Sequence, residues 1–74
     1  MTDRNIIGAV GQVVNAIRGK GGPGEVLLRI GGMRECYIAE SDEPIEHGQT
    51  VLVVDVAPHR HVTVVRWTEL PVPQ

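Results

Sequence analysis

The sequence predicts one all-β domain, a five-stranded Greek-key barrel of the OB type. With 74 residues, the chain has room for a single domain with a modest core. Its apolar stretches are short, rich in β-branched residues and separated by turns containing glycine or proline. The first stretch contains Gly8 and Gly11, which would each cost about 1 kcal/mol in a helix interior but allow a strand to bend around a small barrel. An SH3-like barrel is the alternative fold.

The barrel is expected to occupy residues 6–67. Residues 1–5 are predicted to be a flexible polar lead, and residues 68–74 a tail whose prolines cannot continue a ladder. Four consecutive apolar residues in TVLVVDVA make this the strongest strand signal, and such a run is either covered on both faces or contributes to an interface. The five expected strands are Ile6–Ile17, Glu25–Ile30, Met33–Glu40, Thr50–Ala57 and His61–Trp67.

Two glycine-rich turns bracket the second strand. Gly22-Pro23-Gly24-Glu25 fits a type II turn, because the Pro23 ring presets φ at about −65° and Gly24 can take the positive φ of the third position. Gly31-Gly32 fits a two-residue hairpin loop. This loop would place Ile30 opposite Met33, and every other pair of the hairpin follows from that register.

Pairing through this loop divides the hairpin into two faces. Burial of the first face would remove more apolar area from water, which stabilises the fold by about 25 cal/mol per Å², and would bury only one charged side chain. We therefore assign this face to the core. A register slip of one residue would exchange the faces. The core face contains Val26, Leu28, Ile30, Met33, Tyr37 and Ala39, with Glu35 as its misfit. The outer face contains Glu25, Leu27, Arg29, Arg34, Cys36 and Ile38.

The last part of the chain returns to the barrel after a polar connection. Residues 41–49, SDEPIEHGQ, are expected to form this connection, with one helical turn and with Ile45 as the anchor to the core. In the final strand, Val62 and Val64 are expected to point inward.

Composition restricts the class of partner and the compartment. The net charge is −2, but residues 1–34 contain five Lys or Arg and two Asp or Glu, whereas residues 35–74 contain two and seven. Such a chain has no general attraction for nucleic acid or anionic lipid. A local basic face could still form from Arg18, Lys20, Arg29 and Arg34. A single cysteine suits the reducing cytoplasm. No signal peptide or membrane-spanning run is present, so direct membrane insertion is not expected.

The candidates for chemistry all have simpler structural interpretations. Cys36 lacks an activating arrangement and is interpreted as a small apolar filler. His59 and His61 could share a metal but lack further ligands, and the glycines of residues 19–24 lack the helix of a phosphate site. The acidic residues 40–46 do not have calcium-loop spacing. The sequence therefore predicts no enzyme, no cofactor and no metal.

Binding of single-stranded nucleic acid is the alternative function. Barrels of this type bind single strands with aromatic platforms over a positive groove. Tyr37 and Trp67 are the only aromatic residues, and Tyr37 is assigned to the core. This composition makes nucleic acid an unfavoured partner.

The outer hairpin face has the composition of a protein contact. Leu27, Cys36 and Ile38 form an apolar spot on it, and Arg29 and Arg34 flank the spot. We predict that these five residues bind a partner protein or a second copy of the chain.

The residues also resemble a known family. GAVGQVV at 8–14, GPGEVLLRIGG at 22–32, CYIAES at 36–41, IEHGQTVLVVDV at 45–56 and HVTVV at 61–65 are similar to the soluble OB-type domain of the NfeD-like proteins. The resemblance extends over nearly the whole chain and rests on glycine and valine spacing.

The resemblance implies an interaction module that partners stomatin- or flotillin-like membrane scaffold proteins in membrane quality control. The expected location is cytoplasmic and peripheral at the membrane through that partner. Family members usually carry transmembrane helices that this sequence lacks. The sequence therefore leaves open whether the chain is a fragment of a longer membrane protein. Longer members carry a serine-protease domain, and no residue of this sequence corresponds to its nucleophile. The resemblance therefore does not imply protease activity for this chain.

Overall fold

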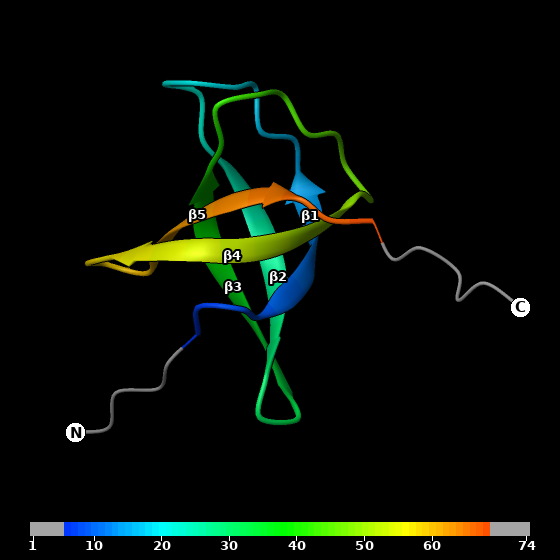
Figure 1. Cartoon of the computed structure of the whole chain (residues 1–74), viewed down its shortest axis with the longest axis vertical. Coiled ribbons are helices and arrows are strands. Elements are labelled where there is room, and N and C mark those ends of the chain that lie inside the picture. The colour runs from blue at the N-terminus through cyan, green and yellow to red at the C-terminus, as the bar shows by residue number, and fades with distance from the viewer. Residues whose placement is uncertain (1–5, 69–74) are drawn as a thin grey trace, which may run out of the picture.

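The computed structural model describes residues 6–68, and these form a closed five-stranded barrel (Figure 1). The predicted all-β barrel is confirmed, and residues 6–68 contain no helix. The expected lead at 1–5, and the tail beyond Thr68, lie outside the described residues. The strands are β1 (Val10–Asn15), β2 (Gly24–Ile30), β3 (Met33–Glu40), β4 (Thr50–Ala57) and β5 (His61–Arg66).

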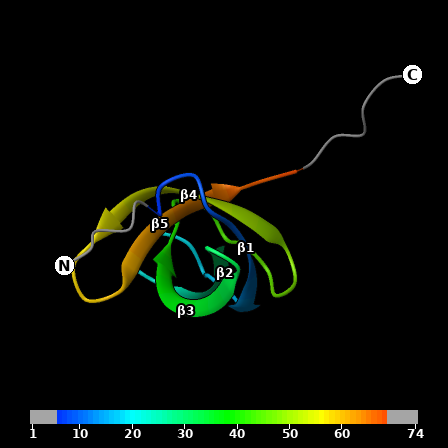
Figure 2. The same ribbon diagram turned by 90° about the horizontal axis from the view of Figure 1, so that it is seen from below.

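The strands follow the order β1-β2-β3-β5-β4, and β4 returns to pair with β1. All neighbours are antiparallel except β3 and β5, which run parallel through three residue pairs, Ile38–Glu40 with His61–Thr63. Figure 2, seen from below, shows the strands arranged around a common centre. The connection of residues 41–49 crosses one end of the barrel beside the connection from β1 to β2, and the β2–β3 hairpin projects from the other end (Figure 1).

The core is aliphatic and draws on every strand. Ile45 is buried as predicted, and its backbone exchanges two 2.9 Å hydrogen bonds with Ile17. This bridge holds the connection of residues 41–49 in an extended form at its centre, so the expected helical turn is absent there. The buried apolar residues are Ile6, Val13, Ile17, Val26, Leu28, Ile30, Ala39, Ile45, Val51, Val53, Val62 and Val64.

Strand β1 is shorter than predicted, and its pairing with β4 closes the barrel. Residues 6–9 form a turn instead, in which the Ala9 N–H donates to the Ile6 carbonyl at 3.0 Å. Gly11 pairs with Leu28 on one side and Val51 on the other. A Cβ at Gly11 would lie 2.2 Å from the backbone oxygen of Leu27, so the close approach of β1 and β2 requires glycine at this position.

The predicted hairpin register is confirmed. Ile30 lies opposite Met33, and Leu27 opposite Cys36, so no slip exchanges the faces. Val26, Leu28, Ile30 and Ala39 are buried, and Tyr37 packs partly buried against them.

Met33 is wrongly assigned to the core, since its side chain is 62% exposed. Strand β1 covers β2 only from Glu25 to Leu28, whereas Met33 is the first residue of β3, directly after the hairpin loop. This end of the β2–β3 hairpin projects from the barrel (Figure 1). The direction of its side chain was predicted correctly, but no core extends that far.

The predicted type II turn at residues 22–25 is also wrong. The turn comes earlier, where the Gly22 N–H donates to the Gly19 carbonyl at 2.9 Å and Gly21 has a φ of +78°. Gly24 is absent from the residues with positive φ and begins β2. Its lack of a side chain serves packing, because a Cβ there would lie 2.3 Å from the backbone oxygen of Asn15.

Strands β4 and β5 form the second hairpin. Val62 and Val64 point inward as predicted, and β5 ends at Arg66, one residue before the expected end. In the apolar run of β4, Val51 and Val53 are buried, whereas Val54 is 43% exposed beside an irregularity in the ladder. The run is therefore fully covered on its inner side, whereas its outer side is half-buried at Leu52 and exposed at Val54.

Candidate protein-binding face

The five residues predicted to bind a partner lie on the outer face of the β2–β3 hairpin. Leu27 is half-buried opposite the exposed Cys36, and Arg29 and Arg34 are an exposed pair directly opposite each other. Ile38 is 36% exposed on the same face. Cys36 is therefore surface and not the apolar filler that its mid-strand position suggested.

An open groove of about 760 Å³ extends this face across β1. Leu27, Arg29 and Arg34 line it from the hairpin, residues 8–12 from β1 and the turn before it, and Thr50 from β4. The structure thus brings together three of the five predicted residues, whereas Cys36 and Ile38 lie outside the groove.

Strand β1 contributes to the groove in a way that the sequence reasoning missed. Val10 and Gln12 alternate around the inward Gly11, so both point outward, and Gln12 lies opposite Leu27. This alternation was a usable signal. The pairing of β1 with both β2 and β4 was not visible in the sequence, and without it these residues could not be placed beside the hairpin.

The groove is positively charged in a chain whose net charge is −2. Arg29 and Arg34 form no ion pair with any other residue of 6–68, and no Asp or Glu of this range lines the groove. By contrast, Arg60 lies 3.7 Å from Glu35, and Arg66 lies 3.6 Å from Glu43. The two groove arginines are therefore available to an external anion.

The side of the hairpin nearest β5 is covered by Arg60. Its Nη2 donates to the Cys36 carbonyl at 3.0 Å, and the Arg60 carbonyl accepts from the Ile38 N–H at 2.9 Å. These contacts hold the β4–β5 turn against β3, at the position where Cys36 and Ile38 lie.

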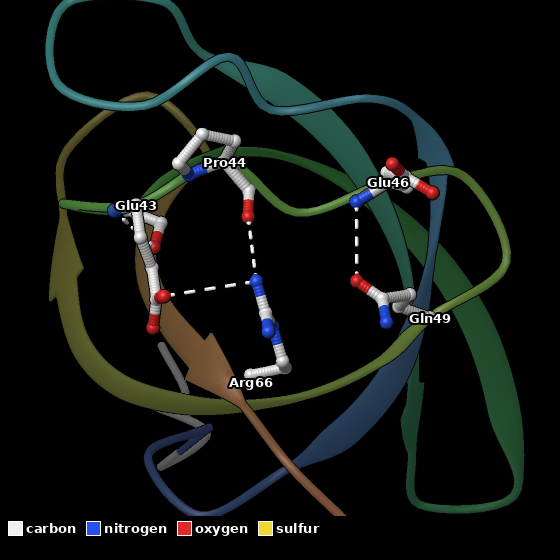
Figure 3. Close-up of polar contacts among 6 residues, drawn as sticks. Glu43, Pro44, Glu46, Gln49 and Arg66 are labelled. Carbon is white, nitrogen blue, oxygen red and sulfur yellow. Dashed lines mark hydrogen bonds and ion pairs between the residues drawn. The ribbon is translucent and has the colours of Figure 1, made fainter.

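The acidic connection of residues 41–49 has a structural task at the opposite end of the barrel. Arg66 Nη2 donates to the Pro44 carbonyl at 2.9 Å, and the Glu46 N–H donates to Gln49 Oε1 at 3.3 Å (Figure 3). Glu43 adds its ion pair with Arg66. These contacts fasten the connection across the barrel end.

The histidines do not assemble a metal site. His61 Nδ1 lies 3.2 Å from the Pro58 carbonyl oxygen and 3.0 Å from that of His59. Because a carbonyl only accepts, this nitrogen carries a proton and donates within the turn. Within residues 6–68, no three His, Cys, Asp or Glu side chains are grouped so that they could hold a metal ion.

Comparison with known families gives the decisive match. The NfeD C-terminal domain family matches residues 10–65, which include all five strands except the last residue of β5. The chain belongs to the NfeD C-terminal domain family. The resemblance noted from the glycine and valine spacing is therefore confirmed.

Two solved structures resemble this NfeD domain. The solution structure of the soluble domain of the NfeD protein YuaF from Bacillus subtilis is 29% identical, with a TM-score of 0.78 over 90% of this chain and 80% of that one. The C-terminal domain of stomatin operon partner protein 1510-C from Pyrococcus horikoshii is 30% identical, with a TM-score of 0.62 over 86% and 91%. No curated protein matches the sequence. Residues 6–68 include no helix that could cross a bilayer.

Proposed function

We propose that this NfeD domain is a non-enzymatic interaction module that binds a stomatin- or flotillin-type membrane scaffold protein through the groove and the outer hairpin face. The observation that carries the proposal is the groove, which combines the apolar Val10 and Leu27 with the cationic Arg29 and Arg34. The similar domain from Pyrococcus horikoshii belongs to a stomatin operon partner protein, and this relationship supports a stomatin-type partner.

The composition of the groove fits a protein surface better than a single-stranded nucleic acid. Protein interfaces are enriched in arginine and depleted in acidic residues. A nucleic-acid groove relies on exposed aromatic platforms, but no aromatic residue of 6–68 lines this one. Tyr37 lies beneath Arg60 and packs against the core. These observations favour a protein partner, which would hold the domain at the membrane periphery.

Co-purification tests this proposal. The full chain should capture a stomatin- or flotillin-type protein from the same genome, and Leu27→Ser should reduce capture at least tenfold. The matched control is Val56→Ser, because Val56 is also a strand residue, is 44% exposed and lies outside the groove. Both variants should keep the wild-type melting temperature. If the wild-type chain captures no scaffold protein, or if Leu27→Ser captures as much as Val56→Ser, the proposal is wrong.

Titration with a labelled oligonucleotide separates the two functions. A nucleic-acid barrel would bind strongly at low salt and lose affinity steeply as salt rises. The interaction module should show no such binding at either salt concentration. Tight, salt-dependent binding would favour the nucleic-acid alternative.

A further inference from the structure

Arg29 and Arg34 form an unbalanced charge pair on the candidate face. They are directly opposite in the β2–β3 register, where two like charges destabilise the hairpin. No carboxylate of residues 6–68 compensates them, and the remaining groove residues are uncharged. An anionic group placed between the two guanidinium groups would remove this repulsion and could accept hydrogen bonds from both.

The apolar part of the groove lies at a fixed distance from this charge pair. Leu27 precedes Arg29 by two residues on the same face of β2, which corresponds to about 7 Å along the strand. Val10 and Gln12 have the same spacing on the neighbouring β1. Side chains at alternate positions of any extended peptide are separated by the same interval.

We propose that the groove receives an extended, acidic segment of the partner protein, in which a carboxylate side chain lies two residues from an apolar side chain. The carboxylate lies between Arg29 and Arg34, and the apolar side chain packs against Leu27, which Gln12 of β1 faces. This inference rests on the proposed function and specifies the chemistry of the partner. Charge complementarity selects the occupant, because a groove with two arginines and no acidic residue in a chain of net charge −2 favours an anionic ligand.

A peptide probe tests the spacing and the charge. Blocked Thr-Val-Thr-Glu-Thr-Val-Thr, whose glutamate has valine two residues away on either side, is titrated into the isotope-labelled full chain. Backbone amide shifts are expected at Val10, Leu27, Arg29 and Arg34. The peptide with Gln in place of Glu should bind about tenfold more weakly, since it loses charge-assisted hydrogen bonds. A peptide with Glu adjacent to its only Val should also bind more weakly.

Protein variants test the same contact from the other side. Arg34→Gln should weaken binding of the Glu peptide about tenfold and leave binding of the Gln peptide unchanged. The matched control is Arg18→Gln, because Arg18 is also exposed but lies outside the groove and should not affect binding. Equal affinity for the Glu and Gln peptides, absence of shifts in the groove, or equal effects of Arg34→Gln and Arg18→Gln would overturn the inference.

Two further probes test other anions. Phosphatidylglycerol vesicles and oligothymidylate should bind more weakly than the Glu peptide; tighter binding that Arg34→Gln abolishes would assign the arginine pair to lipid or nucleic acid and overturn the peptide assignment. The scaffold-capture experiment separates this inference from the proposed function. Capture that depends on Leu27 but not on Arg34 would leave the proposed function standing and refute the acidic segment.

Discussion

The guanidinium carbon of Arg60 lies 4.5 Å from the centroid of the Tyr37 ring, which joins the β4–β5 turn to β3. The same side chain donates a hydrogen bond to the Cys36 carbonyl. β5 pairs with β3 only from Ile38 to Glu40, so within residues 6–68 no other strand continues the ladder along the preceding part of this edge of β3. Arg60 covers this edge with a charged group, a known way in which proteins prevent further strands from adding to a sheet.

Arg60→Ala should both destabilise the barrel and promote its self-association. We expect a loss of about 1 kcal/mol from the missing ring contact and hydrogen bond, measured by urea unfolding. Light scattering should show more association than for the wild-type chain. Arg18→Ala is the control, because Arg18 is an exposed arginine outside the groove with no ion pair in residues 6–68, and its loss should change neither measurement. Wild-type behaviour of Arg60→Ala would show that Arg60 does not protect the edge.

His59→Gly should stabilise the protein. His59 and Arg60 have φ values of +65° and +59°, a left-handed conformation that is unfavourable for residues with a Cβ. Relief of this strain should outweigh the added freedom of the unfolded chain and raise the unfolding free energy by about 0.5 kcal/mol. The reverse change, Gly31→Ala at a φ of +57°, should lower it by about 1 kcal/mol. A lower melting temperature for His59→Gly would contradict this account.

Gly11→Ala should be far more damaging than Gly31→Ala. The new methyl group at Gly11 would lie 2.2 Å from the Leu27 backbone oxygen, whereas one at Gly31 meets nothing within 4 Å. Since β1 and β2 must separate to accommodate it, we expect a loss of about 3 kcal/mol or more. Chemical denaturation of the two variants side by side gives the comparison, and equal losses would show that β1 adjusts freely.

Arg66→Met should loosen the connection across the barrel end. Removal of its hydrogen bond to the Pro44 carbonyl should cost about 1 kcal/mol, whereas Glu43→Gln should cost less because that ion pair is exposed. Hydrogen exchange of the Ile45 amide, which bonds to Ile17, reports the loosening. Faster exchange is expected in Arg66→Met, and unchanged exchange would mean that the Ile17 bridge alone holds the connection.

Local sequence signals predicted the hairpin but not its surroundings. The Gly31-Gly32 loop determined the β2–β3 register, since a two-residue turn leaves one pairing. The exposure of Met33 depends on where β1 stops covering β2, and the role of Gly24 depends on its contact with residues 15 and 16. The exposure of Met33 and the role of Gly24 both depend on contacts between strands, which cannot be predicted from the hydrophobic pattern of a single strand.

The candidate site was predicted in part for the same reason. Leu27, Arg29 and Arg34 could be found because they alternate within one hairpin. The contribution of β1 required knowledge that this strand lies beside β2, and so did the position of the groove, which leaves Cys36 and Ile38 outside it. A prediction of the groove therefore needed the three-dimensional arrangement of the strands.

The groove is complete only when β4 has paired with β1. Strands β1, β2 and β3 pair with their neighbours in the sequence, whereas the contact between β1 and β4 joins segments that lie far apart along the chain. Thr50, at the start of β4, completes the groove only when that contact has formed. A partner that needs every part of the groove would therefore bind only a chain in which β4 has paired with β1.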